Sequence, residues 1–501
     1  MLSWRKDVDC CKWDGVGCNT TTGRIYELML YSFREEGFVD WHFDASLFLP
    51  FQELRRLVLQ NNNIICCFER LSSVINLEHL DLSFNKIGNT ILPFLGGFTL
   101  LKSLYISEIA LIGTTGLEEL SKLRNLEVLD LSFNDLYSSI LPLLRGLHSL
   151  RTLLMSDTQQ KGSINTQDLI ALSNLEELDI SSNNIDKFVE PKDIEGSSNI
   201  TVLWLNHVVS NGSMFQLQSL KTLPKLKTLH LEWNNFTEVQ ISKGLSNFNN
   251  LKELYLDYSD VGNNNAFLLS IANMTSLQIL SLPGCELAGS IQGTRGFCNL
   301  KNLLELDLSW NNLNGDLPHC LVNLTFLQRL DLSHNNLTGK ISQSPLKILT
   351  SIKFLALSNN QFEIPSSLSL FLNHSKLKTF EAFGNEVYSE KGVINHNLEP
   401  KFQLERFYLD SSLGGGSFPE FLYHQRDLQV IYISGVTMMG LELPSWLLEN
   451  NTNLKSLILS DCSLSGIFSL PIRNPNATLM YLDISRNHIY EHAFRKSIVK
   501  V

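Results

Sequence analysis

Apolar and polar positions along the chain repeat one eleven-residue phrase, LxxLxLxxNxL, in which aliphatic residues fill the first, fourth and sixth positions. Eighteen copies begin at Leu54, Leu77, Leu101, Leu126, Leu150, Leu175, Ile200, Leu226, Leu251, Leu277, Leu303, Leu327, Ile352, Leu377, Leu404, Leu428, Leu454 and Leu479. Successive copies start about 25 residues apart, which lies within the range of leucine-rich repeats and outside the other common solenoid periods.

The phrase predicts a short strand followed by a turn. In LEVLDLSFNDL, Leu126, Leu129, Leu131 and Leu136 are expected to point inward, while the residues between them alternate outward. Each turn buries its leucines only against its neighbours, so the array grows in one dimension as one elongated domain. We predict an α/β-type repeat solenoid, a leucine-rich-repeat horseshoe or superhelix of about 18–19 turns, with a parallel sheet on its concave face.

Three segments are expected along the chain. Residues 1–24 are the remnant of an N-terminal cysteine cap, residues 25–489 form the solenoid, and residues 490–501 form an uncapped C-terminal tail. A cap is expected ahead of the first strand because a solenoid otherwise exposes the hydrophobic end of its core.

An asparagine recurs at the ninth position of the phrase, where its amide can bond backbone groups of adjacent turns that would otherwise lack partners. These residues are Asn62, Asn85, Asn134, Asn183, Asn234, Asn311, Asn335, Asn360, Asn385 and Asn487. Cys285 and Cys462 occupy the same position in two turns, and we predict that they are buried, inert substitutes.

The remaining cysteines suggest disulfides. Cys10, Cys11 and Cys18 lie in DCCKWDGVGC, and a bridge from Cys11 to Cys18 would persist only in an oxidising compartment. A reduced thiol cluster or half of a metal site is the alternative, and the partner of Cys10 is expected upstream of this chain. Cys298 and Cys320 precede successive repeat starts by five and seven residues, which suggests a second bridge, with buried free thiols as the alternative.

Charge and hydropathy narrow the location and the partners. The net charge of −11 leaves no basic stripe, so nucleic acid is not an expected partner. No run of 18 apolar residues appears, and Trp4, Arg5 and Lys6 interrupt the start, so we expect this chain to lack both a transmembrane segment and a signal peptide. Glycosylation acceptors give weak support to secretion; they are Asn19, Asn199, Asn211, Asn235, Asn273, Asn323, Asn336, Asn373, Asn450 and Asn476.

The cap SW...DCCKWDGVGC...TGRIYELML and turns such as LDLSWNNLNGDLPHCLVNLTFLQRLDLSHNNLTGKI resemble the extracellular part of plant leucine-rich-repeat receptor-like proteins, over residues 2 to 489. The resemblance implies an ectodomain fragment that recognises a peptide, protein or glycan ligand in defence or developmental signalling. It also implies an extracellular position at the plasma membrane and partner receptor kinases for the full-length protein, with the membrane reached only through a segment absent from this chain.

The fifth and eighth residues of the phrase are expected on or beside the exposed sheet face. Three consecutive turns place aromatic and imidazole groups there, namely Trp204, His207, His230, Trp233, Tyr255 and Tyr258. Two carboxylates at the seventh position, Glu232 and Asp257, flank them. Large rigid rings gain contact area with little loss of entropy, so exposed aromatic clusters are typical binding anchors. We predict a ligand-binding patch; solvent-facing residues free to vary, or a surface covered by glycan or a partner, are the alternatives.

The sequence gives little support for an enzyme. His488, Glu491 and His492 match the inverted zinc-protease pattern HxxEH, but they follow a strand and the ladder residue Asn487 instead of opening a helix. No P-loop, GxSxG or GxGxxG occurs, so we predict no enzyme activity, metal or cofactor. Two other binding functions stay open: a secreted leucine-rich-repeat inhibitor of cell-wall-degrading enzymes, and a cytosolic leucine-rich-repeat scaffold.

Overall fold

The structure is a computed structural model of residues 1–501 and forms two compact units. It describes residues 8–32, 40–66, 68–69, 71, 74–190, 196–208, 215–236, 244–245, 248–261, 265–291, 295–390, 399–411, 417–437, 445–468 and 478–491. Unit 1 comprises Met1–Asn234 with Lys243–Leu251, and unit 2 comprises Asn235–Ser242 with Lys252–Val501.

Unit 1 is built on parallel strands, one per turn, each only a few residues long. In sheet order they are β2 (Ile25–Met29), β4 (Arg56–Val58), β6 (His79–Asp81), β7 (Ser103–Tyr105), β8 (Val128–Asp130), β9 (Thr152–Leu154), β11 (Glu177–Asp179), β13 (Val202–Trp204) and β14 (Thr228–His230). The first strand of the unit, β1 (Val16–Cys18), pairs antiparallel with β2 and covers the edge of the sheet.

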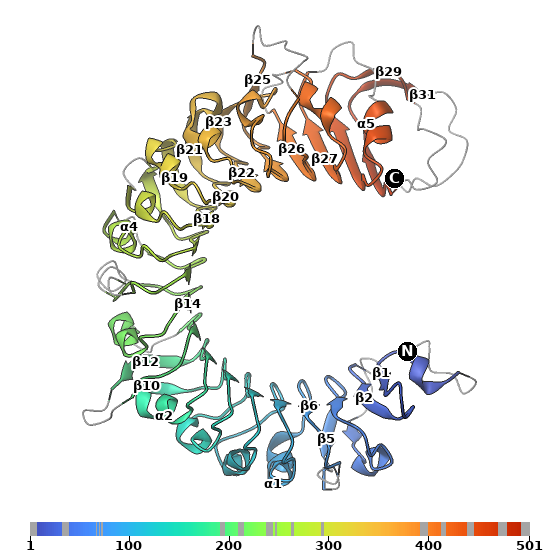
Figure 1. Cartoon of the computed structure of the whole chain (residues 1–501), viewed down its shortest axis with the longest axis vertical. Coiled ribbons are helices and arrows are strands. Elements are labelled where there is room, and N and C mark those ends of the chain that lie inside the picture. The colour runs from blue at the N-terminus through green and yellow to red at the C-terminus, as the bar shows by residue number, and fades with distance from the viewer. Residues whose placement is uncertain are drawn as a thin grey trace. The chain divides into compact units, whose positions relative to one another are not determined.

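Unit 2 repeats the arrangement with its own parallel strands. They are β15 (Glu253–Tyr255), β16 (Ile279–Ser281), β18 (Glu305–Asp307), β20 (Arg329–Asp331), β22 (Phe354–Ala356), β24 (Thr379–Glu381), β26 (Arg406–Asp410), β27 (Val430–Ser434), β28 (Ser456–Ser460) and β30 (Tyr481–Asp483). Within each unit these strands lie along one side and the helices along the other (Figure 1).

In many turns the chain forms a second short strand on the flank, and these strands pair in parallel with those of neighbouring turns. In unit 1 these are β3 (Trp41–His42) with β5 (Ile64–Cys66), and β10 (Lys161–Asn165) with β12 (Asn184–Val189). In unit 2 they are β17 (Ala288–Ser290), β19 (Asn312–Asp316), β21 (Asn336–Lys340), β23 (Gln361–Pro365) and β25 (Glu386–Tyr388), and the pair β29 (Ser465–Phe468) with β31 (His488–Glu491).

Helices close the turns and are short. Among the described residues, the α-helices are α1 (Leu92–Leu95), α2 (Thr166–Ala171), α4 (Asn265–Ile271) and α5 (Ser445–Asn450). The 3₁₀ helices are η1 (Cys10–Lys12), η2 (Ala45–Phe48), η4 (Gly88–Ile91), η5 (Leu117–Lys122), η6 (Leu141–Leu144), η7 (Leu217–Thr222), η9 (Arg295–Asn299), η10 (His319–Asn323), η11 (Ile341–Gln343), η12 (Pro345–Ile348), η13 (Ser369–Phe371) and η14 (Glu420–His424).

The core consists of the aliphatic positions that the repeat predicts. Leu126, Leu129, Leu131 and Leu136 are all fully buried, and their counterparts in adjacent turns stack on them. Fully burying one leucine side chain contributes roughly 1.5–3 kcal/mol before the entropy of ordering is subtracted, so stacked turns stabilise one another. This architecture confirms the predicted leucine-rich-repeat solenoid with its parallel sheet.

The asparagine ladder is present as predicted. Asn134 is buried, and its amide nitrogen donates to the carbonyl groups of Leu131 at 2.8 Å and Ile106 at 2.9 Å. Its amide oxygen accepts the backbone N–H of Leu111 at 2.9 Å. Cys285 takes the ladder position in another turn, where its thiol is 3.1 Å from the carbonyl oxygen of Leu256 and burial raises its pKa to about 12. The substitute is therefore inert, as expected.

The eighth position has one unusual property that shapes the surface. Its backbone adopts a left-handed conformation even where the residue is bulky, because the chain must turn after the strand before the ladder asparagine enters the core. Residues with this conformation include Asn61, Phe84, Glu108, Phe133, Asp157, Ser182, His207, Trp233, Tyr258, Trp310, His334, Asn359, Asp461 and Arg486. The recurrence shows that the repeat imposes the geometry, whatever the side chain.

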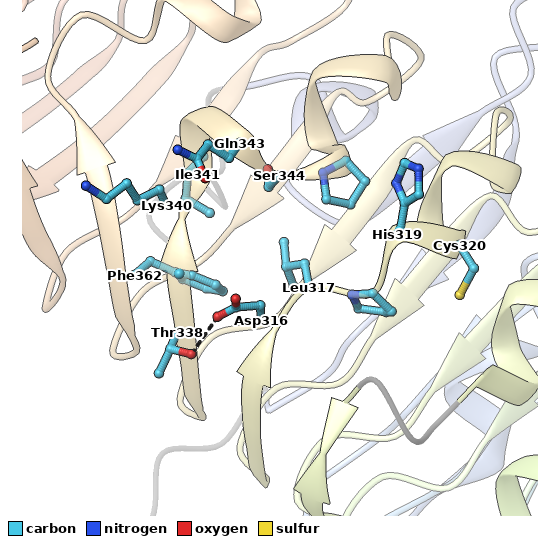
Figure 2. Close-up of a pocket in the computed structure, with 13 residues that line it drawn as sticks. Asp316, Leu317, His319, Cys320, Thr338, Lys340, Ile341, Gln343, Ser344 and Phe362 are labelled. Atoms are coloured by element: carbon cyan, nitrogen blue, oxygen red, sulfur yellow. Dashed lines mark hydrogen bonds between the residues drawn. The ribbon is translucent and has the colours of Figure 1, made fainter.

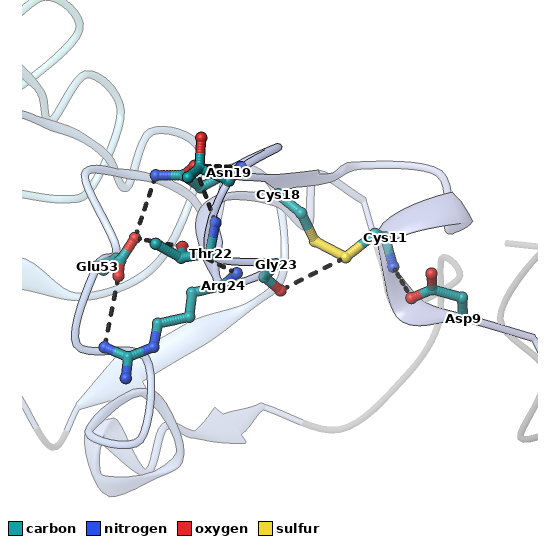
Figure 3. The surroundings of a disulfide bond; sticks show 9 residues. Asp9, Cys11, Cys18, Asn19, Thr22, Gly23, Arg24 and Glu53 are labelled. Carbon is teal, nitrogen blue, oxygen red and sulfur yellow. Dashed lines mark hydrogen bonds and ion pairs between the residues drawn. A yellow bond between two sulfur atoms is a disulfide. The ribbon is translucent and has the colours of Figure 1, made fainter.

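Both predicted disulfides are present. Cys11 bonds to Cys18 with the two Cα atoms 5.5 Å apart (Figure 3), and Cys298 bonds to Cys320 with its Cα atoms 5.7 Å apart. Next to the first bridge, Glu53 accepts hydrogen bonds from Thr22 and Asn19 and pairs with Arg24, which ties the cap loop to the following turn. Cys10 is a free thiol.

The structure also describes most of the predicted glycosylation acceptors and part of the HxxEH string. Among the acceptor residues, Asn19 and Asn199 are half-buried, Asn211 and Asn476 lie outside the described residues, and the others are exposed, namely Asn235, Asn273, Asn323, Asn336, Asn373 and Asn450. His488 and Glu491 belong to strand β31, so the HxxEH string does not form the helix that zinc proteases require, and His492 is also outside the described residues.

Candidate functional site

The predicted patch has its centre on the sheet face at the end of unit 1. Trp204 ends β13 and His230 ends β14, and the parallel register makes these two residues direct neighbours. The indole and imidazole rings are stacked, with centroids 3.4 Å apart and planes 4° from parallel. Sequence position alone placed the two residues on neighbouring strands, and the structure adds the stacking.

Carboxylates hold both rings of this stack. The indole N–H of Trp204 donates to Glu177 Oε1 at 3.1 Å, and His230 Nδ1 lies 2.9 Å from Glu232 Oε1. Glu232 also receives support through its backbone N–H, which donates to the side-chain oxygen of Asn206 at 3.0 Å. The stack is therefore fixed by hydrogen bonds from three neighbouring turns.

The second carboxylate oxygen of Glu232 is unusual. Oε2 is buried and has no hydrogen-bond partner among the described residues. A buried acceptor without a partner costs on the order of 1–3 kcal/mol, and such groups in native proteins often mark functional positions. Because Oε2 is buried, an N–H group of a ligand could reach it only after neighbouring side chains move, and such a contact would remove that cost.

The other predicted residues border the stack or lie in unit 2. His207 and Trp233 occupy eighth positions of unit 1, and 60% of the Trp233 surface is exposed. Tyr255, Asp257 and Tyr258 belong to unit 2, where Tyr255 ends β15 and Tyr258 is exposed. The predicted patch is thus described in two parts, one in each unit.

A second stack was not predicted. In unit 2, the eighth-position residues Trp310 and His334 of adjacent turns are stacked, with centroids 3.6 Å apart and planes 10° from parallel. Asn359, one turn further, lies with its amide nitrogen 3.0 Å from His334 Nε2. These rings border a hollow of about 440 Å³, which Gly284, Glu286 and Asn336 also line.

Burial favours the neutral form of the imidazole in this second stack. Partial burial lowers the pKa of His334 below its usual value, although the nearby Asp331 opposes that change. The Asn359 amide donates to Nε2, so Nε2 is the unprotonated ring nitrogen. The segments SWNN and SHNN place Trp310 and His334 at the eighth positions of adjacent turns. The pair can be found in the sequence only when the eighth positions of adjacent turns are compared.

Acidic residues at the fifth position have structural roles. Asp307 and Asp331 are register neighbours on β18 and β20, and each accepts the backbone N–H of the serine two residues later. Burial, followed by the charge of Asp331, raises the pKa of Asp307. Arg329 pairs with Asp331 at 3.3 Å and stacks over the ring of Phe354. These contacts agree with the prediction that the recurrent aspartates are structural and not a catalytic pair.

A larger hollow lies on the flank of unit 2, away from the sheet. Its volume is about 570 Å³, and its polar side chains are Asp316, His319, Thr338, Lys340, Gln343 and Ser344 (Figure 2). Thr338 donates to Asp316 at 2.8 Å, and Lys340 pairs with Glu363 at 3.1 Å. Three of the polar side chains, Asp316, Thr338 and Lys340, are thus engaged in contacts within the protein.

Family models for leucine-rich repeats match separate parts of the chain. One covers residues 75–92 and 171–187, and another covers residues 125–147, 302–324, 326–347 and 453–475. Cuscuta receptor 1 of Solanum lycopersicum is 34% identical over 97% of this chain and 46% of its own length. Receptor-like protein 13 of Arabidopsis thaliana is 34% identical over 99% of this chain and 43% of its own length. The chain belongs to the plant leucine-rich-repeat receptor-like proteins.

This receptor-like chain spans less than half the length of those two relatives. Among solved structures, it is similar to the ectodomain of the Arabidopsis receptor kinase HAESA in complex with the IDA peptide hormone. The similarity has 22% identity and a TM-score of 0.47 over 97% of this chain and 90% of that chain. Among the described residues, no helix has both the length and the hydrophobicity needed to cross a bilayer.

Proposed function

We propose that this chain is the ligand-recognition part of a plant cell-surface receptor-like protein that signals in defence or development through a partner receptor kinase. The relationship to Cuscuta receptor 1 and to receptor-like protein 13 supports a receptor. The two disulfides support an oxidising, extracellular compartment and weigh against a cytosolic scaffold.

The observation that carries the proposal is the Trp204–His230 stack beside the unpaired oxygen of Glu232. Stacked rings on a sheet face give a ligand contact area at little cost in entropy, and the carboxylate oxygen selects for an N–H donor. Peptide backbones combine both properties, since they carry N–H groups at regular spacing beside apolar side chains. We therefore place a peptide or protein ligand at the patch of Trp204, His230, Glu232 and Trp233.

No sequence or structural feature favours catalysis over recognition in this assignment. Within the described ranges, the His488 and Glu491 pair lies on a strand and the fifth-position aspartates are occupied as backbone caps. A secreted inhibitor of cell-wall-degrading enzymes remains the competing binding function, and it differs from the receptor in needing no partner kinase.

The test replaces Trp204, Trp233 and Tyr255 together with alanine. The chain, fused to a secretion leader and a membrane anchor, is expressed in leaves, and calcium release is recorded after application of fractionated plant, parasite and microbial extracts. An active fraction should give a response with the unmodified chain and none with the triple variant. A triple variant that folds and responds fully would reject the patch, and a chain that inhibits wall-degrading enzymes without any kinase-dependent response would reject the receptor.

Two control variants accompany this test. Phe133→Ala removes another exposed eighth-position ring with the same left-handed backbone, and it should leave the response unchanged. Asn235→Gln removes the acceptor of the N-x-S/T sequence two residues after Trp233. It establishes whether a glycan at that position limits access to the patch.

A further inference from the structure

The hollow on the flank of unit 2 lies where two adjacent turns differ in length. The turn that begins at Leu327 is one residue longer than the turn that begins at Leu303. In the shorter turn, Leu317 leads through Pro318 directly into η10. In the longer turn, Ile341 starts the additional helix η11 before η12 begins. Segments of unequal length cannot stack residue on residue, and a space of about 570 Å³ remains between them (Figure 2).

Both walls of the hollow are tied to other turns. Cys320 lines one wall and is disulfide-bonded to Cys298, which lies in η9 of the preceding turn. In the other wall, the hydroxyl group of Ser342 lies 2.9 Å from the hydroxyl group of Tyr388, a residue of β25. A ligand would therefore meet a preformed hollow, so little conformational entropy would be lost on binding.

The hollow offers a ligand hydrogen bonds more than apolar contact. Leu317 and Ile341 are 8% and 1% exposed and Phe362 is fully buried, so these residues close the hollow but give a ligand little apolar area. The side chains of His319 and Gln343 are exposed, and neither has a hydrogen bond or an ion pair within the described part of the chain. A neutral imidazole and a carboxamide each combine a donor with an acceptor in one planar group.

The charges around the hollow disfavour an anionic ligand. Lys340, the lysine of the lining, is paired with Glu363 at 3.1 Å. Asp316 uses one carboxylate oxygen to accept the hydrogen bond of Thr338 at 2.8 Å, and its side chain is exposed. Gly339 leaves room for that carboxylate, because a Cβ atom there would lie 2.7 Å from it. The second carboxylate oxygen therefore adds an acceptor to the same space.

We propose that this hollow is a binding site for a neutral sugar unit, with Asp316, His319 and Gln343 as its hydrogen-bond partners. Each sugar hydroxyl group both donates and accepts, so a sugar can bond to a carboxylate, an imidazole and a carboxamide at once. The volume of about 570 Å³ lies within the range of small-ligand pockets. The site goes beyond the proposed function, because it belongs to unit 2 and does not involve the Trp204–His230 stack of unit 1.

Saturation-transfer NMR on the whole secreted chain tests the site with the methyl glycosides of glucose, galactose, mannose and xylose. At least one glycoside should bind with a dissociation constant on the order of 1 mM, since a few exposed hydrogen bonds supply the affinity. His319→Ala and Gln343→Ala should each weaken that glycoside about five-fold, because each removes one hydrogen-bond partner. Galacturonic acid should bind more weakly than the neutral glycosides, because Asp316 and Glu363 repel its carboxylate.

Gln361→Ala is the matched control, because Gln361 is exposed in the adjacent strand β23 but does not line the hollow. It should leave the affinity unchanged, and so should Trp204→Ala, which separates this inference from the proposed function. The site is overturned if none of the four glycosides binds. It is also overturned if a bound glycoside has the same affinity for His319→Ala and Gln343→Ala as for Gln361→Ala.

Discussion

The two tryptophan–histidine stacks have nearly the same ring geometry but different surroundings. Trp204 and His230 sit at fifth positions, where His230 is only 8% exposed and both rings are hydrogen-bonded to glutamates. Trp310 and His334 sit at eighth positions, where the backbone turns left-handed and carries the side chains out to the rim of the sheet. The position within the repeat thus decides whether the same two residue types lie within the sheet face or in the more exposed turn that follows the strand.

This difference separates what a ring contributes to stability from what it offers to a ligand. A side chain held by half-buried carboxylates couples recognition to the fold, because its loss leaves polar groups without partners. An exposed ring can be lost with little effect on the array and yet remove a docking surface. Mutations at the Trp204–His230 stack should therefore lower both stability and binding, whereas mutations at the Trp310–His334 stack should change stability little.

The largest effect is expected from the disulfide that adjoins the turns of the second stack. Replacing Cys298 and Cys320 with serine removes a link between η9 and η10, and a closed loop of 22 residues corresponds to about 3 kcal/mol of unfolding free energy. Hydrogen exchange should show faster opening of β18 and β20, while β13 and β14 keep their protection. Equal loss of protection in both regions would mean that the effect is not local.

The second largest expected effect is the difference in lost stability between alanine variants of the two tryptophans. Trp204→Ala removes a half-buried ring and the donor to Glu177, and we expect about 2–3 kcal/mol of lost local stability. Trp310→Ala should cost about 0.5 kcal/mol, as for other exposed positions. Comparable losses in hydrogen-exchange protection would contradict the distinction between a buried and an open stack.

A smaller difference in stability is expected between variants of the residues that hydrogen-bond to each imidazole. Glu232→Ala removes the hydrogen-bond partner of His230 and should lower the free energy of unfolding by about 1–2 kcal/mol. The loss is smaller than it would otherwise be, because the variant also removes Oε2, a buried oxygen with no partner among the described residues. Asn359→Ala removes the partner of His334 at a half-exposed site and should cost about 0.5 kcal/mol. Urea-dependent hydrogen exchange of β14 and β20 measures the two, and a more damaging Asn359→Ala would reverse the comparison.

The smallest effect is a dependence on pH at the open stack. Because partial burial lowers the pKa of His334, the unfolded chain binds the proton more readily than the folded protein does. The stabilising contribution is therefore present above the ordinary histidine pKa of about 6.5 and declines as the pH falls toward the lowered value. Imidazole NMR should give His334 a midpoint below 6.5, and a midpoint above it would show that Asp331 outweighs desolvation.

The sequence by itself determined the repeat, the inward leucines and the asparagine ladder, and it suggested both disulfides, which the structure contains. These features follow from local chemistry that recurs at a fixed period, so each turn predicts the next. The positions of Trp204 and His230 on adjoining strands also followed from that period, since a parallel register pairs equivalent residues.

Only the tertiary structure decided how these side chains are used. It showed the stacking of Trp204 on His230, the unpaired oxygen of Glu232, and the Trp310–His334 platform that the sequence had concealed within its consensus. The physical reason is that equivalent residues of adjacent turns are some 25 positions apart in the chain but neighbours in space. Ring contact, burial and the satisfaction of hydrogen bonds depend on that proximity, and no single turn contains it.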